Sequence, residues 1–455
     1  MVAHSKFGDG EDDEWLQRRA LKRAKRQEMA AAIHRRRCQA TVLLATDGGQ
    51  GPSGKKRRSS RPFVWEEHVT RFSEAEFKLR YRFTFDAFTE LVELLRADLS
   101  VSDEKQAKHA KWGTVIQPET KLAMALRFLA GGSPLDLKLI YDVSKSYVYH
   151  CVWLVVAAVN KKLPMDFPID DVGKLRKLEA EWRARARCSE WYGQVGALDG
   201  VHFPMLAPSK KDVDDPMRYF VARKDKYALL AMAICDSARR ILWCNISQTP
   251  NTHDSLAFAL TELGMRIRNG DLPPGFFINA DAAFSMSNSM ITPSGDPQLN
   301  NSFDFHQSAN RVAIECAFGL LVKRWPILWK PLQVKFERRA PLIGACMSLH
   351  NFCIDHNVKE DTCCQNGISR IQPGRWDLTP VFDSMGRPVE YLKDVVRGDG
   401  ARRSRAHVSS DGHQKFNELV AAVVACGMVR PALPAHAVRK EKRKRGRRPL
   451  ANVNR

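Results

Sequence analysis

Hydrophobic positions recur with helical spacing between about residue 80 and residue 160. Thr84 stands where an N-cap belongs, and the apolar face that follows it is made of Phe85, Phe88, Val92 and Leu95. Apolar residues three and four apart lie on one side of a helix, and Thr is a favoured N-cap. A further stretch with the same spacing predicts a second helix over residues 118–130.

The next thirty residues have the pattern of two helices joined by a turn. A Gly-Gly pair at 131–132 ends the preceding helix, and a Ser-Pro pair at 133–134 begins a short one. A turn over 142–144 then leads into a longer helix. This order is typical of DNA-binding helix-turn-helix units, but plain helical hairpins share it. If the unit binds DNA, the residues expected to face the groove are Ser144, Lys145, Ser146 and Tyr149.

From about residue 190 the pattern changes to apolar runs typical of strands. One run ends at Asp199, and two more, over 227–235 and 241–247, are joined by a short turn that predicts a hairpin. A helix over 253–264, a strand over 276–281 and a later helix follow. Three strands in a meander, a helix, a fourth strand and a helix predict an α/β fold, a mixed sheet with flanking helices. That is the order of the RNase H-like fold.

Three carboxylates in this α/β part carry the candidate chemistry. Asp199 and Asp281 close predicted strands, and Glu315 lies on the predicted later helix. Carboxylates from two strand ends and one helix can converge to hold a pair of Mg²⁺ ions, which activate water against a phosphodiester. The sequence therefore predicts a metal-dependent nuclease centre.

The same residues have structural alternatives that the sequence leaves open. Asp199 and Gly200 could form a turn, and Asp281 could cap a following helix. Glu315 lies one step from an apolar stripe, where a carboxylate needs a partner. A metal ion would serve, and so would Arg311, one helical turn earlier.

Other polar residues allow further hypotheses. Asp254 could either stabilise the start of its helix or bind metal. His350, Cys353 and His356 recur at three-residue spacing, which suggests zinc, but the spacing fits no common closed zinc site and favours core packing. Contacts with DNA phosphate are expected of His202, Lys323 and Arg324.

Charge and composition indicate a polyanionic partner. Lys and Arg number 72 against 51 Asp and Glu, a net charge of +21, concentrated over residues 18–37, 55–58 and 439–445. Such runs bind nucleic acid or direct nuclear import. The 11 cysteines form no CxxC pair, as in a reduced intracellular protein. No secretory signal or membrane-spanning stretch is visible, so we expect a soluble nuclear protein without membrane contacts.

These patterns together predict four regions. Residues 1–75 are expected to be a disordered basic arm with a helix over 14–37, and residues 76–165 a helical, helix-turn-helix-like DNA-binding region. Residues 189–357 are expected to form an RNase H-like nuclease core. Residues 358–455 are expected to contain a loop-rich segment, a short helix over 413–424 and a basic tail. Residues 445–449 are close to an AT-hook for the minor groove, but a nuclear-localisation run is the favoured interpretation.

With these residues in view, the chain resembles the PIF/Harbinger transposases and the Harbinger-derived nucleases, which carry a DDE endonuclease domain. The resemblance covers about residues 80–357, and its motifs are residues 197–202, 252–255, 310–328 and 349–353. It implies that Asp199 is the first catalytic aspartate, Asp281 the second and Glu315 the closing glutamate. Asp254 falls at another acidic position of the family, as a further ligand or a support. After Asp281 the chain departs from the family, with Ala-Ala-Phe-Ser in place of a small turn and an aromatic-proline pair.

The function that this resemblance implies is a nuclear DNA endonuclease and transposase that uses Mg²⁺ or Mn²⁺. Asp199 would bridge two ions, with Asp281 on one and Glu315 on the other, and water or a DNA 3′-hydroxyl would attack. Two other classes stay open: a domesticated DNA-binding or regulatory protein with weak or no cleavage, and an RNase H-like enzyme that acts on RNA. The family also implies a Myb-like companion DNA-binding protein, and a homo-oligomer stays open.

Overall fold

The structure is a computed structural model that describes residues 63–100, 115–186, 188–294, 301–358 and 412–428. All of them belong to one compact unit, residues 62–455. The following expectations lie outside the described residues: the arm before residue 63 with its helix over 14–37, the loop-rich segment over 359–411, and the AT-hook-like run over 445–449.

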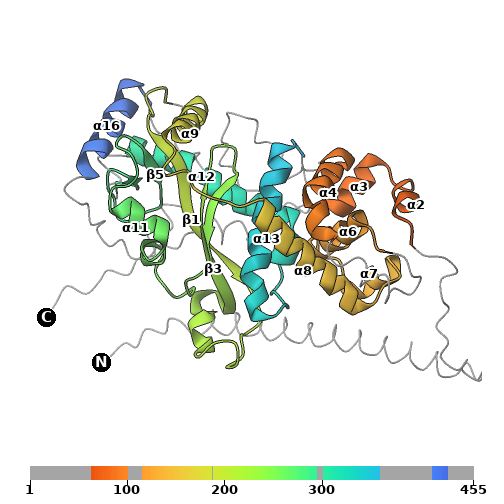
Figure 1. The fold of residues 1–455 in the computed structure, drawn as a ribbon. Helices are drawn as coiled ribbons and strands as arrows, with labels where there is room; N and C mark the ends of the chain where they lie inside the picture. Colours follow the sequence, from red (N-terminus) through yellow and green to blue (C-terminus); the bar gives the residue numbers. More distant parts are fainter. Residues whose placement is uncertain (1–62, 101–114, 187, 295–300, 359–411, 429–455) are drawn as a thin grey trace, which may run out of the picture. The chain divides into compact units, whose positions relative to one another are not determined.

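The first part of the described chain is helical, and side-chain caps define where its helices begin. Ser73 forms a capping box with Glu76, and the hydroxyls of Thr84, Ser133 and Ser144 each accept a backbone N–H in the first turn of the helix that follows. The helices are α2 (Trp65–Val69), α3 (Glu74–Tyr81), α4 (Phe85–Leu99), α6 (Pro118–Leu129), α7 (Pro134–Ile140) and α8 (Lys145–Lys162). The predicted helical region is therefore confirmed, including the helix, turn and longer helix over α7 and α8 (Figure 1).

Helical structure begins earlier than the predicted boundary at residue 75. Trp65 of α2 is buried and stacks on Phe88 of α4, with ring centroids 5.2 Å apart. Phe77 and Tyr81 of α3 contact the same indole ring. The prediction of a disordered arm up to residue 75 is wrong for this segment, because Trp65 and its apolar neighbours pack into one aromatic cluster with α3 and α4.

Two aromatic residues differ in exposure from the prediction, which placed Phe85 on a buried helix face and Tyr149 in a DNA groove. Phe85 occupies the first position of α4 and is 44% exposed, with an edge contact to Phe77. Tyr149, expected to face a DNA groove, is half-buried and packs edge-on against Phe128, with ring centroids 5.8 Å apart. The groove-facing candidates that remain exposed at the start of α8 are Ser144, Lys145 and Ser146.

The helix α8 joins the helical region to the α/β part of the chain. It packs against α4, α6 and α7, and also against α13 (Phe336–Asp355). The side-chain amide of Asn160 donates to the carbonyl of Pro341 at 2.9 Å, and the hydroxyl of Ser348 donates to the carbonyl of Leu163 at 2.8 Å. One continuous hydrophobic core therefore extends through both parts.

The α/β part is built on a mixed sheet. Its strands are β1 (Gln194–Pro204), β2 (Phe220–Val221), β3 (Lys226–Cys235), β4 (Ile241–Asn245), β5 (Phe277–Asn279) and β6 (Met290–Ile291). They lie in the order β2-β3-β1-β5-β6, and β4 pairs with β3. Antiparallel pairing joins β1, β3 and β4, which confirms the predicted hairpin, and β5 pairs parallel to both β1 and β6.

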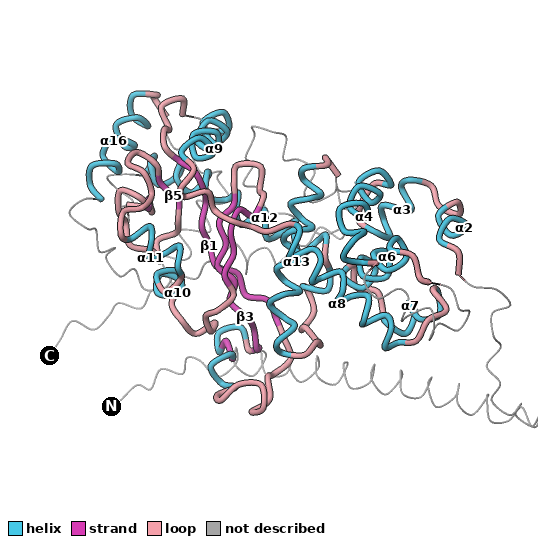
Figure 2. The backbone as a smooth tube through the Cα atoms, viewed as in Figure 1, coloured by secondary structure: helices cyan, strands magenta, loops and turns pink. Residues whose placement is uncertain are grey.

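The two faces of the sheet are covered by different helices. Successive residues of a strand point to opposite faces. Ala197, Val201 and Phe203 of β1 share a core with α12 (Asn301–Arg324) and α13, whereas Leu198 packs with residues of α9 (Val172–Arg185), α10 (Asp254–Ala259) and α11 (Glu262–Arg268). The sheet thus lies between two helical layers (Figure 2), and the predicted mixed α/β fold is confirmed.

Two helical segments of this part differ from the prediction. Residues 253–264 form two helices, α10 and α11, because Thr261 caps the second one and its N–H bonds to the carbonyl of Phe258. The helix α9 was not predicted. It buries Leu175, Leu178 and Trp182, and the N–H of Lys174 bonds to its N-cap Asp171.

The last described element, α16 (Gly412–Ala425), returns to the α/β part. Its Leu419 and Val423 are buried with Trp191, Phe277 and Phe303. The predicted helix over 413–424 is therefore present, and it is packed rather than free. Within the described residues, the helices are all too short or too polar to cross a membrane.

Candidate active site

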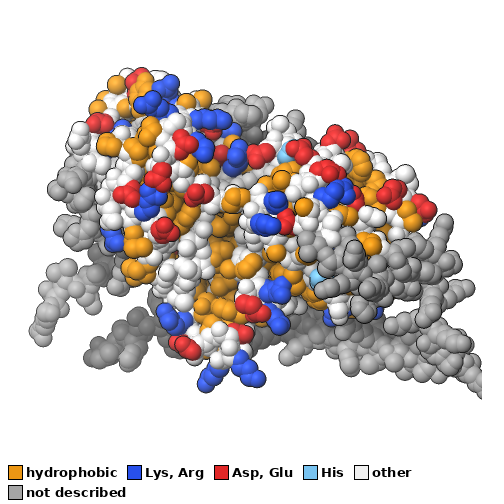
Figure 3. Space-filling view, in the orientation of Figure 1, with side chains coloured by type: hydrophobic (Ala, Val, Ile, Leu, Met, Phe, Trp, Pro, Cys, Tyr) orange, Lys and Arg blue, Asp and Glu red, His pale blue; other side chains and the backbone are white. Residues whose placement is uncertain are grey.

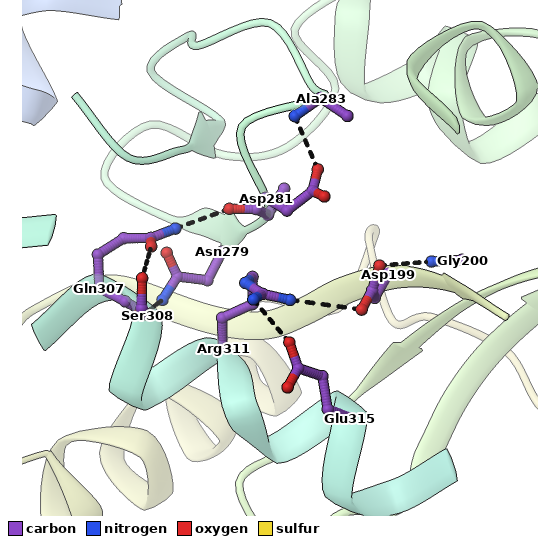
Figure 4. Close-up of polar contacts among 10 residues, drawn as sticks. Asp199, Gly200, Asn279, Asp281, Ala283, Gln307, Ser308, Arg311 and Glu315 are labelled. Atoms are coloured by element: carbon purple, nitrogen blue, oxygen red, sulfur yellow. Dashed lines mark hydrogen bonds and ion pairs between the residues drawn. The ribbon is translucent and has the colours of Figure 1, made fainter. Parts of the chain in front are cut away.

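Parallel pairing of β1 and β5 sets Asp199 and Asp281 at the same level of the two neighbouring strands. The last paired residues of the two strands are Ala197 and Asn279. Each aspartate lies two residues beyond that pair, so both stand just past the point where the parallel pairing of β1 with β5 stops (Figure 4). Carboxyl ends of parallel strands are where open α/β folds gather polar groups.

Asp199 lies within β1 and not at its end. The strand continues to Pro204, and Asp199 pairs with Ala233 of β3. Its Oδ1 accepts the N–H of Gly200 at 2.8 Å. The expectation that the chain turns at Asp199 is therefore wrong, because the antiparallel partner β3 extends past the point where β5 stops.

Asp281 begins a tight turn that leads to β6. Its Oδ1 accepts the N–H of Ala283 at 2.8 Å, and its carbonyl accepts the N–H of Phe284 at 3.2 Å. Side-chain acceptance two residues ahead is typical of Asp in turns. The helix-capping alternative is wrong, since a turn and a strand follow Asp281. The Ala-Ala-Phe sequence that departs from the family pattern forms this turn, with Phe284 buried.

A cluster of buried amides fixes α12 to the end of β5. The side-chain amide of Asn279 donates to the Gln194 side chain at 3.3 Å and to the carbonyl of Gln307 at 3.2 Å. The Gln307 amide donates to the carbonyl of Ala280 at 2.7 Å, next to Asp281. All three amide side chains are fully buried. These three residues were not predicted from the sequence, although polar amides inside apolar runs, such as Asn279 after Phe-Phe-Ile, are a usable signal.

The helix α12 then directs a stripe of polar side chains at the strand ends. Gln307, Arg311 and Glu315 are four residues apart and therefore lie on one face of the helix. The Arg311 guanidinium lies between two carboxylates: Nη1 is 3.3 Å from Oδ2 of Asp199, and Nη2 is 2.6 Å from Oε1 of Glu315 (Figure 4). The side chains of Asp199 and Arg311 are each 16% exposed, and that of Glu315 is 7% exposed.

The electrostatics of this cluster are dominated by burial. Burial raises the pKa of Asp199 to about 7; the charge of Arg311 lowers it, and the charges of Asp281 and Glu315 raise it further. Burial also raises the pKa of Glu315, against the opposing effect of Arg311. Burial alone would lower the pKa of Arg311, but the three carboxylates outweigh it and hold that pKa above its usual value. The four groups therefore act as one electrostatic unit.

The oxygen atoms of these three carboxylates are suitable ligands for a divalent cation, but the side chains lie too far apart to hold one in this arrangement. Oxygen ligands are those that Mg²⁺ and Mn²⁺ prefer. As the described side chains stand, however, no three Asp, Glu, His or Cys residues approach closely enough to hold a metal ion. The Arg311 guanidinium lies where two of these carboxylates would otherwise meet.

Asp254 is brought to β1 from the opposite face of the sheet. It is the first residue of α10, and a Cβ built on Gly200 would lie 3.2 Å from its Oδ1. The side chains of neighbouring residues Asp199 and Gly200 point to opposite faces. The structure therefore joins Asp199 and Glu315 through Arg311, sets Asp281 on the neighbouring strand, and places Asp254 on the other face of the sheet.

The predicted phosphate-binding residues lie in different surroundings. Arg324 is buried, and its Nη1 donates to Nδ1 of His350 at 2.9 Å and to the His350 carbonyl at 3.2 Å. A buried guanidinium held in this way is part of the core, which corrects the expectation for Arg324. His202 is half-buried, with Nε2 3.4 Å from the carbonyl of Pro250, and Lys323 is half-buried near the end of α12.

The zinc alternative does not fit the described residues. His350 is fully buried between Arg324 and the carbonyl of Arg239, while Cys353 donates to the carbonyl of Arg82 at 3.7 Å. His356 lies 3.3 Å from a Glu90 carboxylate oxygen. Each residue has its own partner, and the core-packing interpretation accounts for all three.

Comparisons with known proteins match part of the chain to one protein family. Residues 198–351, which include Asp199, Asp254, Asp281 and Glu315, match the family described as DDE superfamily endonuclease. No solved structure matches the chain.

Curated relatives match a larger part of the chain. The rat protein named "Putative nuclease HARBI1" is 25% identical over 276 residues, which are 59% of this chain and 74% of the relative. The human protein of that name is 24% identical over 276 residues, with the same shares. The Xenopus laevis protein is 24% identical over 291 residues, 62% of this chain and 78% of the relative.

Proposed function

We propose that this chain, whose residues 198–351 form a DDE superfamily endonuclease domain, is a divalent-metal-dependent DNA nuclease of the Harbinger transposase type. The observation that carries the proposal is the register of β1 and β5, which sets Asp199 beside Asp281 while α12 adds Glu315. Relatives named as nucleases support the reaction class. The reaction is hydrolysis of a phosphodiester bond, with joining of DNA ends as a further step.

In this proposal Asp199, Asp281 and Glu315 would hold Mg²⁺ or Mn²⁺ through their carboxylate oxygens. Divalent ions bound there would activate the attacking oxygen and stabilise the leaving one. Asp281 is held by its turn, and Glu315 by a helix tied to β5 through Gln307. Asp254 takes a supporting role, since its carboxylate packs against Gly200 and so limits how β1 can shift.

DNA as substrate and the nucleus as location rest on the charge of the chain. The basic runs over residues 18–37, 55–58 and 439–445 lie outside the described residues. On the face shown in Figure 3, Lys and Arg side chains of the described part are interspersed with Asp and Glu. We therefore assign sequence-independent DNA attraction to the basic runs, with Lys145 at the exposed start of α8 as an additional contact. A Myb-like companion and a homo-oligomer remain part of the proposal.

One observation favours a second candidate, a domesticated DNA-binding regulator with weak or no cleavage. Arg311 pairs with the carboxylates of Asp199 and Glu315, and the described carboxylates do not enclose a position for a metal ion. A chain in which that arrangement were permanent would keep its fold and its DNA binding without cutting.

Metal-dependent nicking of supercoiled DNA by the full-length chain distinguishes the two. Asp199→Asn, Asp281→Asn and Glu315→Gln remove charge with little change of shape. We expect each to abolish nearly all nicking in Mg²⁺ or Mn²⁺ and to leave salt-sensitive DNA binding in place.

The matched control is Asp271→Asn, since Asp271 is 42% exposed and pairs with Arg266 on the other side of the sheet. It should nick DNA as the wild type does. Nicking that survives in the three site variants would contradict their roles, and tight DNA binding without nicking by the wild type in either metal would favour the regulator.

A further inference from the structure

We propose that Arg311 is an internal counter-cation, which occupies the acidic centre in the absence of metal and is displaced when a divalent ion binds. The proposal rests on the proposed function, because it assigns the metal to Asp199, Asp281 and Glu315. It adds a residue that lowers metal affinity and keeps the metal-free centre folded.

The contacts of Arg311 differ from those of an ordinary helix ion pair. Glu315 lies four residues along α12, a common pairing distance, but the same guanidinium also reaches Asp199 on β1. It therefore connects two elements that the candidate metal would connect. Both carboxylates use an oxygen on this contact, so an ion that takes the same oxygens competes with Arg311.

Burial separates Arg311 from other arginines that join two carboxylates. Arg96 contacts Glu93 and Glu119, and its side chain is 41% exposed. Arg266 contacts Asp170 and Asp271 and is 34% exposed. Arg311 is only 16% exposed. Buried carboxylates need a counter-charge, whereas those at the surface are largely served by water and salt.

The charges favour replacement of the Arg311 guanidinium by the divalent ion over simultaneous binding of both. Two or three buried carboxylates can be balanced by one guanidinium or by a divalent ion, and two cations a few ångströms apart repel in a medium of low polarity. The spacing agrees, since the described side chains enclose no metal position while the guanidinium is in place. The Arg311 guanidinium stands at the end of a long side chain, so we expect it to leave the two carboxylates by rotation about side-chain bonds.

The experiment measures metal binding without DNA, on the full-length chain. Wild type, Arg311→Gln and Arg311→Lys are titrated with Mn²⁺ by calorimetry, and their thermal unfolding is followed with and without Mn²⁺. Arg311→Gln should unfold at a lower temperature than the wild type in the absence of metal. It should bind Mn²⁺ on the order of tenfold more tightly, a size typical of coupling between competing ligands, and show the larger Mn²⁺-induced rise in Tm.

Two further variants make the result specific. Arg311→Lys keeps the charge but loses the two-pronged contact, so its Mn²⁺ affinity should fall between those of the other two. Arg266→Gln, which removes an exposed arginine with two carboxylate partners, should bind Mn²⁺ as the wild type does.

The outcomes separate this inference from the function beneath it. If Arg311→Gln and Arg311→Lys bind Mn²⁺ no more tightly than the wild type, Arg311 does not compete with metal and the inference is overturned, while the nuclease proposal stands. If Mn²⁺ binds to none of the chains, or binds equally well after Asp199→Asn, both proposals fail. Tighter binding in Arg311→Gln that Asp199→Asn abolishes supports both.

Discussion

At the scale of single residues, His350 shows how burial sets a charge state. Nδ1 accepts a hydrogen bond from Arg324, and Nε2 donates to the carbonyl of Arg239. Burial and then the Arg324 charge lower the pKa of His350 to about 3. The ring is therefore neutral in the folded chain at neutral and mildly acidic pH, and its hydrogen bonds give it a structural role.

This neutrality predicts a loss of stability in acid. The unfolded chain protonates His350 near pH 6.5 and the folded chain only near pH 3, so the unfolded state binds more protons between these values. Lowering the pH from 7.5 to 5 should cost about 2 kcal/mol of unfolding free energy through this residue. Denaturant unfolding of the wild type and of a His350 variant at both pH values measures it, because groups with raised pKa values, such as Asp199, contribute with the opposite sign.

A substitution isolates the contribution of His350. His350→Gln keeps an acceptor and a donor but cannot titrate, so its loss of stability on acidification should be smaller than that of the wild type. The exposed His150 provides the control, and His150→Gln should keep the wild-type dependence on pH. Equal acid sensitivity in wild type and His350→Gln would contradict the assignment.

At the scale of elements, the junction of α10 and α11 depends on a glycine. A Cβ on Gly264 would lie 2.0 Å from the carbonyl oxygen of Phe258, and this oxygen also accepts the hydroxyl of Thr261. A backbone atom cannot move aside as a flexible side chain can. Gly264→Ala should therefore destabilise the chain by roughly 2–4 kcal/mol, as expected of overpacking in a closed site.

Gly319 in α12 is the matched control for that helix junction. A Cβ there would meet nothing within 4 Å, and the residue lies inside a helix. Gly319→Ala should leave the chain unchanged or stabilise it by up to about 1 kcal/mol, because Gly is a poor helix former. Thermal unfolding of the two variants side by side tests the pair, and similar shifts in Tm would show that the close contact with Phe258 is unimportant.

At the scale of the whole molecule, α16 brings a distant part of the chain onto the candidate nuclease domain. Val423 is 1% exposed and Val424 is 72% exposed. Val423→Asp buries a carboxylate beside Trp191 and Phe303, so it should release α16 and cost on the order of 3 kcal/mol. Val424→Asp should change stability by less than about 0.5 kcal/mol.

Limited proteolysis and thermal unfolding follow the release of α16. Cleavage near residues 412–428 should become faster in Val423→Asp and stay unchanged in Val424→Asp. If both variants resist cleavage as the wild type does, α16 does not depend on this buried contact.

Much of the element order could be predicted from the sequence, because caps and periodicity act locally. Thr84 and Ser133 begin the helices that their types indicated, α8 follows the predicted turn over 142–144, and the runs over 227–235 and 241–247 form the predicted hairpin. Errors occurred where distant residues decide. Trp65 orders the segment before α3 through contacts with α3 and α4.

The sequence by itself determined which carboxylates to consider, since Asp199, Asp281 and Glu315 were named from their runs and from the family resemblance. Only the tertiary structure decided how they meet. The pairing of Ala197 with Asn279 sets the two aspartates side by side, the alternation of β1 puts Asp254 on the other face, and packing of α12 inserts Arg311 between Asp199 and Glu315. Strand register and helix packing are properties of residues far apart in the chain, and local patterns do not encode them.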